Sequence, residues 1–339
     1  MVNSNKIAGL DSLRFFAFLS VFLYHNSKVF ALGYLGIDFF FVLSSFLITF
    51  LALQEIKITN SFSRINFFIR RSLRIYPLYF SVLFFSFIIL PQLIKFSNAE
   101  ISLPANKYFY YLFVSNYDLS DHLFALKFLW SIAVEEQFYL LFLLLSFFFT
   151  RNFSISIIAL AMIYFVFVFL AWRFNWSSYF NTLNYLIDFA VGMCLAKWYT
   201  HFAGFNLKLI VGVIVLSALN VYFFYQIDAL SNFVKLPLAI LFSAIILLTV
   251  KLFSFRFFYE NKFFITTEYL GKLTFGLYVY SGFVITFGYK FIPVDNLWFK
   301  VFIDFLMLIA ISITSYYLFE KPFLKLKNRF RFNKHGEAL

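Results

Sequence analysis

Ten apolar windows of about twenty residues constrain the fold of this chain more than any other feature of its sequence. A helix needs about 20 mainly apolar residues to cross about 30 Å of hydrocarbon, and a helix satisfies its own backbone polar groups. The windows therefore predict an all-α polytopic membrane protein with about ten transmembrane helices. They fall near residues 7–30, 34–53, 73–93, 126–149, 154–172, 180–198, 209–225, 236–253, 273–292 and 298–319.

The composition agrees with a membrane protein and excludes other classes. Hydrophobic residues make up 63% of the chain and charged residues only 13%, which excludes a soluble globular domain, a disordered chain and a nucleic-acid-binding protein. The net charge of +12 is therefore interpreted as a topology signal. The single cysteine, Cys194, excludes a disulfide within the chain.

The distribution of Lys and Arg predicts the orientation of the helices. With the N-terminus in the cytoplasm, the inner segments carry 19 of these residues and the outer segments 8, among them Lys235 and Lys300. Both termini are therefore expected in the cytoplasm, and the protein is expected in the cytoplasmic membrane. We expect one transmembrane domain over residues 1–325, a basic tail over residues 326–339, and no appended soluble domain.

The first window contains two ionisable residues, Arg14 and His25. Their spacing of 11 residues returns to nearly the same helical face, about 16 Å further along the axis. An ionisable side chain in a span is costly, so each is a candidate functional residue. Two structural alternatives stay open: Arg14 snorkels to the interface, and His25 is satisfied by a neighbour.

Asp38 opens the second window at the depth expected for His25 in the first. A carboxylate beside an imidazole fixes its tautomer and stabilises the imidazolium, as a general base requires. The alternative is that Asp38 stabilises the N-terminus of its own helix, and the two roles are compatible.

The fourth window contains Glu135, Glu136 and Gln137 at a depth of about 12–15 Å. Neighbouring helical residues point about 100° apart, so the two acids cannot both face lipid cheaply. The sequence favours a polar cavity over a structural hydrogen-bonding site between helices. Asp188 and Glu320 are weaker candidates, because an ion pair with a neighbouring cation would be enough to explain each of them.

An arginine cluster, Arg70, Arg71 and Arg74, precedes the third window. Arg70 and Arg74 lie one turn apart on a helix, which suits a bidentate grip on phosphate. Composition alone favours a topology signal or a contact with anionic lipid, so a phosphate site needs another argument.

Six segments of the sequence together resemble the integral-membrane acyltransferases of acyltransferase family 3. They occur in the order of that family and extend from the first window to the last. The segments are Arg14 to His25, Gly36 to Ile48, Arg70 to Pro77, Leu129 to Tyr139, Leu270 to Tyr278 and Phe319 to Phe323.

The resemblance implies a ten-helix enzyme that transfers an acyl group, expected to be acetyl, from cytoplasmic acyl-CoA to a hydroxyl of an extracytoplasmic carbohydrate such as surface polysaccharide. Acyl-CoA is then a donor substrate, and neither a bound cofactor nor a metal site is expected. The expected partners are membrane lipid, acyl-CoA and the carbohydrate. The implied catalytic residues are His25, Asp38 and Glu136, with Asp38 or Glu136 orienting His25. The implied substrate-binding residues are Arg14, Arg70, Arg71, Arg74, Tyr76, Ser131, Glu135, Gln137, Tyr139 and Glu320.

Two departures from the family pattern affect these expectations. Ser44-Ser45 stands where the family often has Ser-Gly, and Val279-Tyr280-Ser281 stands where the family often has Trp-His, so a ninth-helix histidine is absent. The chain also resembles members without a fused outer domain. The other histidines, His122, His201 and His335, are expected in two loops and the tail.

The rival interpretation is a carrier or flippase for a lipid-linked sugar, because polar residues inside spans also mark transport paths. The sequence lacks the paired half-chains with matching Pro or Gly interruptions that such proteins often show, which favours the enzyme.

Overall fold

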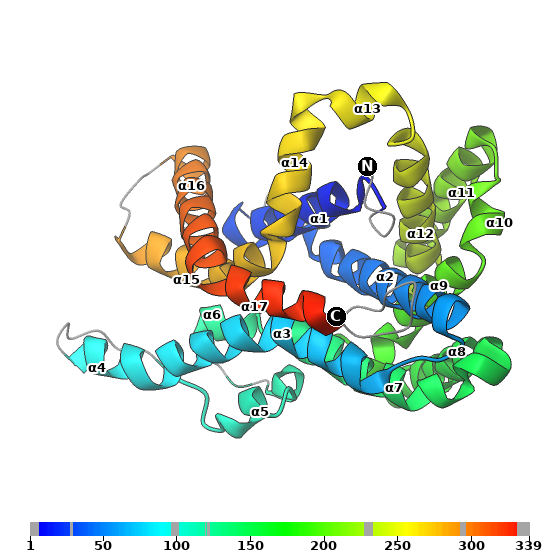
Figure 1. Ribbon diagram of the computed structural model, residues 1–339. Coiled ribbons are helices and arrows are strands. Elements are labelled where there is room, and N and C mark those ends of the chain that lie inside the picture. The colour runs from blue at the N-terminus through cyan, green and yellow to red at the C-terminus, as the bar shows by residue number, and fades with distance from the viewer. Residues whose placement is uncertain are drawn as a thin grey trace. The chain divides into compact units, whose positions relative to one another are not determined.

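Every regular element in the described residues is helical, and none of these residues forms a strand (Figure 1). The computed structural model describes residues 7–27, 30–95, 102–118, 120, 123–226, 233–291 and 296–330. His122, His335 and residues 331–339 of the expected basic tail lie outside the described residues. The prediction of an all-α chain is therefore confirmed for the described part of the chain.

The chain divides into two compact units that alternate along the sequence. The first unit comprises Met1–Val21, Tyr34–Phe62 and Leu144–Lys272, and the second comprises Phe22–Gly33, Ser63–Leu143 and Leu273–Leu339. Helix α1, Leu10–Ser27, contributes residues to both units, with Arg14 in the first and His25 in the second.

The first unit contains most of the middle of the chain. Its helices, besides the start of α1, are α2 (Gly36–Thr59), α8 (Phe149–Phe174), α9 (Leu186–Lys197), α10 (Tyr199–Ala203), α11 (Leu207–Gln226), α12 (Lys235–Leu252), α13 (Arg256–Glu260) and α14 (Lys262–Lys272), with short 3-10 turns at Gly33–Leu35, Ser146–Phe148 and Thr182–Tyr185.

Helices α2 and α9 pack closely in the first unit, and small residues make this possible. A Cβ added to Gly192 on α9 would lie only 2.5 Å from the main-chain oxygen of Val42 on α2. The Ser45 hydroxyl of α2 donates at 2.5 Å to the main-chain oxygen of Phe189, which lies about one turn before Gly192 on α9. Ser45 stands where the family resemblance leads one to expect glycine, and here Gly192 on the facing helix supplies the close approach.

The second unit contains the remaining helices. They are α3 (Arg64–Phe84), α4 (Leu90–Lys95), α5 (Tyr108–Tyr111), α6 (Phe124–Lys127), α7 (Trp130–Leu145, with its last two residues in the first unit), α15 (Thr274–Phe291), α16 (Leu297–Ser315) and α17 (Lys321–Lys327), with π-helical segments at Phe85–Ile89 and Tyr316–Glu320 and 3-10 turns at Ser115–Tyr117 and Asn328–Phe330.

In the second unit, α15 packs against α16, and α17 packs along α3 (Figure 1). Tyr79 of α3 is fully buried and holds the segment that follows α5. Its hydroxyl donates to the main-chain oxygen of Tyr110 at 2.8 Å, and its ring stacks on Phe113 at 4.5 Å. Phe113 and Asn116 of this segment accept hydrogen bonds from Gln137, a residue of the candidate site.

Seven helical segments of the described chain are long and apolar enough to span a membrane, or eight if α14 and α15 form one broken span. Each of the ten predicted windows is helical over its described residues, but the first and sixth do not qualify as spans, and the ninth qualifies only together with α14. Helix α1 has 18 residues but is too polar to count as a span, because it carries Asp11, Arg14, His25 and Asn26. In the sixth window, α9 has only 12 residues. The chain is therefore a multi-pass helical protein, with seven or eight spans supported by length and composition.

Candidate functional site

The candidate catalytic residue His25 lies in the last turn of α1. Its half-buried ring packs against three aromatic rings, with centroid distances of 4.5 Å to Phe128, 4.9 Å to Tyr24 and 5.7 Å to Phe124. Phe124 begins the short helix α6, and Phe128 follows that helix. The imidazole is therefore held between aromatic side chains of the second unit.

Phe128 is held in place by two hydroxyl groups from other helices. The Tyr278 hydroxyl of α15 donates to the main-chain oxygen of Phe128 at 3.0 Å, and it lies 2.6 Å from the Ser131 hydroxyl at the start of α7. Both Ser131 and Tyr278 are buried. The predicted site residue Ser131 therefore connects, through Tyr278, to the residue that packs on His25.

The two acids of α7 have separate partners, and Glu136 is the more deeply buried of the two. Glu135 accepts a hydrogen bond from the Tyr139 hydroxyl one turn further along the helix. Glu136 is 5% exposed, and the Tyr76 phenol and Arg71 guanidinium lie near enough to interact with its carboxyl group. Its Oε1 atom has no hydrogen-bond partner among the described residues.

The amide of Gln137 contacts the segment that Tyr79 anchors. Its nitrogen donates to the main-chain oxygen of Phe113 at 2.7 Å and to Oδ1 of Asn116 at 2.8 Å. Because consecutive helical residues point about 100° apart, Gln137 reaches a different neighbour from either glutamate. It therefore positions α7 against this segment.

The predicted arginine cluster lies half-buried on α3, and each guanidinium contacts a different group. Arg70 donates to the main-chain oxygen of Phe330 at 2.6 Å. Arg71 lies over the rings of Tyr139 and Phe67, with its Cζ atom 5.3 Å and 5.8 Å from the ring centroids. A cation over an aromatic face is attracted by the ring quadrupole, so Arg71 is oriented by α7.

Arg74 lies close enough to Glu320 for their charges to interact. Glu320 ends a π-helical segment and accepts a hydrogen bond at 3.1 Å from Ser315, which in turn accepts one at 3.0 Å from Tyr280. Tyr280 is one of the residues that replace the expected Trp-His pair. Here its hydroxyl links α15 to α16.

Two sets of contacts along α7 place several site residues of the second unit in a series. From His25 the series runs through Phe128 and Tyr278 to Ser131, and further along α7 the contact between Glu135 and Tyr139 leads to Arg71. Ser131, Glu135 and Tyr139 are four residues apart, so they share one face of α7 over about 12 Å. This face connects the imidazole with the arginine cluster.

The first unit contains two predicted site residues, Asp38 and Arg14. Asp38 lies in the first turn of α2, as an acid that favours a helix N-terminus would, but its carboxylate forms a buried ion pair with Lys235 of α12. Arg14 pairs with Asp11 on α1 at 2.7 Å.

A second buried carboxylate, that of Asp188 on α9, is close enough to interact with the charges of both Asp38 and Lys235. Neither of its oxygens has a hydrogen-bond partner among the described residues. The Lys235 ammonium also lies over the Tyr185 ring, 4.2 Å from its centroid.

Three buried charged residues differ from the expectations drawn from the sequence. Lys235 and Lys300, expected in outer connections, lie in helices and are 7% and 5% exposed. Asp304, four residues after Lys300, is fully buried in α16 and was not identified. The rule that singles out ionisable residues inside apolar windows would have found Asp304 if applied to the last window.

A helical chain with seven or eight candidate spans is a multi-pass membrane protein. A family model described as an acyltransferase domain matches residues 7–320. The chain therefore belongs to acyltransferase family 3, as its motifs suggest.

Curated relatives agree with this family. The chain is 35% identical over 225 residues to the O-acetyltransferase OatA of Staphylococcus aureus strain NCTC 8325, an alignment that covers 60% of this chain and 36% of that protein. It is 34% identical over 144 residues to the peptidoglycan O-acetyltransferase OatA of Listeria monocytogenes, covering 40% of this chain and 23% of that protein. The aligned part thus spans about a third or less of these relatives. No solved structure matches the chain.

Proposed function

We propose that this protein is a membrane O-acetyltransferase that moves an acetyl group from acetyl-CoA in the cytoplasm to a hydroxyl group of a carbohydrate outside the cytoplasmic membrane. The observation that carries the proposal is the series of contacts in the second unit between His25 and the arginine cluster, in a chain of the acyltransferase family. The name of the Listeria relative favours a cell-wall glycan as the acceptor.

In the proposed reaction His25 is the general base. The imidazole takes the proton of the acceptor hydroxyl while that oxygen attacks the thioester carbonyl. The carbon–sulfur bond breaks, the proton passes from the imidazolium to the leaving thiolate, and the products are an acetyl ester and free coenzyme A. Glu136 or Asp38 stabilises the imidazolium, and the remaining site residues bind the substrates.

The arginine cluster is the proposed binding site for the phosphate groups of the donor. Guanidinium groups match phosphate oxygens in a bidentate geometry, and Arg71 is already oriented by Tyr139. The face of α7 then extends from the donor phosphates toward His25.

The proposal is tested by expressing the chain in a bacterium that lacks surface O-acetylation and analysing its cell-wall glycan and surface polysaccharides by mass spectrometry. An added mass of one acetyl group, removed by mild alkali, is expected only when the wild-type chain is present. Unchanged glycans together with a shift of lipid-linked sugar across the membrane would instead support the carrier.

Replacing Arg71 or Arg74 with Ala is expected to raise the KM for acetyl-CoA about tenfold or more. A hydrogen bond to a charged group contributes roughly 1.5–3 kcal/mol, and 1.4 kcal/mol corresponds to a factor of ten in affinity. Lys at either position should restore part of the affinity, because it keeps the charge but not the planar fork. Initial rates at limiting acetyl-CoA measure the effect.

Lys208→Ala is the control for these arginine variants, because Lys208 is another cation on the expected cytoplasmic side but is exposed on α11. Its KM should equal that of the wild type. Normal KM values for both arginine variants would show that the cluster serves only topology or lipid contact.

The Glu136→Gln variant is expected to lower turnover about a hundredfold while leaving the affinity for acetyl-CoA nearly unchanged. Glutamine keeps the shape and hydrogen-bonding capacity of the side chain but removes the charge that stabilises an imidazolium. Steady-state kinetics of the purified variant separate turnover from KM.

Glu136→Leu provides the comparison for a purely structural role. If Glu136 only connects helices, the Gln variant should behave like the wild type and the Leu variant should lose thermal stability. Normal turnover in Glu136→Gln would remove this residue from the mechanism and leave Asp38 as the candidate partner of His25.

A further inference from the structure

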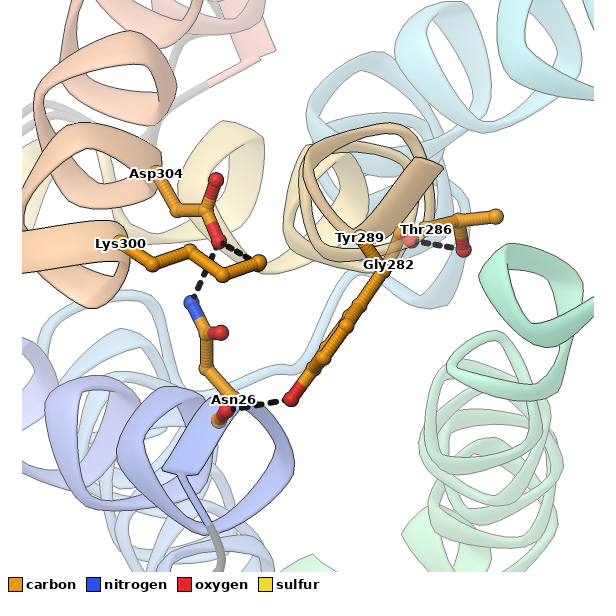
Figure 2. A network of polar contacts seen from close by, with 6 residues as sticks. All are labelled: Asn26, Gly282, Thr286, Tyr289, Lys300 and Asp304. Carbon is orange, nitrogen blue, oxygen red and sulfur yellow. Dashed lines mark hydrogen bonds and ion pairs between the residues drawn. The ribbon is translucent and has the colours of Figure 1, made fainter. Parts of the chain in front are cut away.

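The residue that follows His25 is held by a polar network from two other helices of the second unit, buried except for the exposed ring of Tyr289 (Figure 2). The side-chain nitrogen of Asn26 donates to Oδ2 of Asp304 at 3.0 Å, and the same oxygen pairs with the Lys300 ammonium at 2.7 Å. From α15, the Tyr289 hydroxyl donates to the main-chain oxygen of Asn26 at 2.8 Å. We call these four residues the Asn26 clamp.

The clamp contacts α1 where a helix needs outside partners. The last four carbonyl groups of a helix receive no hydrogen bond from an N–H group of the same helix. Asn26, the second-last residue of α1, carries one of these carbonyl groups. Tyr289 therefore satisfies a main-chain group that would otherwise lack a donor. Asp304 holds the side chain of the same residue, so the last turn is fixed at two points.

A further contact in the network joins Lys300 of α16 to Tyr289 of α15. The Lys300 ammonium lies 3.9 Å from the centroid of the Tyr289 ring, where a cation is attracted by the ring face. Beside Tyr289, Gly288 leaves room for the Asp304 carboxylate, into which a Cβ at that position would intrude. The sequence of both helices is thus adapted to bring these groups together.

Burying the polar groups of this network lowers the stability of the folded protein. Asn26 and Asp304 are fully buried, and Lys300 is 5% exposed, in or beside helices that are otherwise apolar. Oδ1 of Asn26 and Oδ1 of Asp304 have no hydrogen-bond partner among the described residues, and unpartnered buried polar atoms lower stability. Apolar residues would connect the three helices at lower cost, so the network is better explained by a specific requirement for geometry.

We propose that the Asn26 clamp positions His25 for acyl transfer, so that Asn26, Tyr289, Lys300 and Asp304 are positioning residues of the reaction. This inference rests on the function proposed above. The clamp fixes the last turn of α1 from one side, while Phe124 and Phe128 hold the imidazole ring itself. A small rotation of this turn would move the imidazole away from the acceptor hydroxyl, and misplacement by about 1 Å can reduce a rate about a hundredfold.

Tyr289→Phe tests the clamp with the smallest change, because it removes one hydroxyl and keeps the ring beneath Lys300. Turnover of the folded protein is expected to fall between about tenfold and about a hundredfold, with an unchanged KM for acetyl-CoA and only a small decrease in thermal stability. Asn26→Ala, which removes the link to Asp304, should have an effect of the same kind. The measurements are steady-state acetyl transfer and thermal unfolding of the purified full chain.

The matched control is Thr286→Val on the same helix. Thr286 donates to the main-chain oxygen of Gly282 at 2.6 Å, so the variant also loses a hydroxyl and a hydrogen bond, but this bond lies within α15 (Figure 2). Its turnover should equal that of the wild type.

A double variant separates positioning from other effects. If the clamp acts through His25, adding Tyr289→Phe to His25→Ala should leave the residual rate unchanged. Wild-type turnover in Tyr289→Phe and Asn26→Ala, loss of turnover that only parallels loss of folded protein, or a further equal loss in the double variant would each overturn the inference. Failure of the proposed function is recognised separately, because the wild-type chain would then transfer no acetyl group.

Discussion

The His25→Ala variant is expected to lose acetyl transfer by between about 100-fold and 10,000-fold while inserting and folding as the wild type does. This range is the typical contribution of a positioned general acid–base group. His25 is half-buried against Phe128 and Phe124, so loss of its ring leaves a small gap rather than an unpaired charge. Turnover of the purified variant at saturating donor, together with its thermal unfolding in detergent, measures both effects.

His201→Ala is the control for this variant. His201 is the other histidine of the described residues, and it is exposed on α10 with its ring near Phe202 and Phe205. His201→Ala should retain full turnover, and His25→Asn should be as inactive as His25→Ala. A well-folded His25→Ala protein with wild-type turnover would remove the imidazole from the mechanism.

The Lys235→Met variant is expected to lower the free energy of unfolding by about 3–5 kcal/mol. Removing one partner of a buried ion pair leaves the other charge uncompensated. The side chain of Asp38 is only 2% exposed. A second buried acid nearby, Asp188, adds to the imbalance of charge. Thermal and denaturant unfolding in detergent should show this loss.

Neutralising the acid as well provides the decisive comparison. Lys235→Met combined with Asp38→Asn should recover part of the stability, because only the Asp188 carboxylate then lacks a cation, although activity should stay low if Asp38 supports catalysis. Lys208→Met, which removes an exposed cation from α11, should leave stability unchanged. Wild-type stability in Lys235→Met would show that the ion pair contributes little.

The helical fold could be predicted because apolar length directly determines helices in a membrane. All ten windows are helical over their described residues, and the windows that fail as spans show the limit of this prediction. In the sixth window, the chain forms the 3-10 turn Thr182–Tyr185 before α9, and Asn181 caps this turn by accepting from the main-chain nitrogen of Leu183 at 3.0 Å. Such a local hydrogen bond shortens a helix without changing its hydrophobicity.

The candidate site could be predicted in part because buried ionisable residues are conspicuous in an apolar sequence. The spacing of Glu135 and Tyr139 on one helical face follows from sequence, and the structure shows that they are hydrogen-bonded. The sequence could not predict that Arg71 lies over the Tyr139 ring, because that contact depends on how α3 and α7 pack.

Lys235 and Lys300 show why the remaining polar contacts were missed. A lysine at the edge of an apolar window is as consistent with an interfacial loop as with a buried pair, because only the partner distinguishes them. Lys235 finds Asp38 nearly two hundred residues earlier in the chain. Lys300 pairs within its own helix, four residues before Asp304, so attention to helical spacing would have predicted that pair.

The central claim, that the chain transfers an acetyl group through His25, is tested most directly with acetyl-CoA labelled in the acetyl group. Membranes that contain the wild-type chain, or the His25→Ala variant at equal amount, are incubated with the labelled donor and cell-wall glycan fragments. The account predicts alkali-labile label in the glycan with the wild-type chain, release of one free coenzyme A per ester formed, and almost no label with His25→Ala. Equal labelling by both proteins, or no labelling by a well-folded wild-type chain, would contradict it.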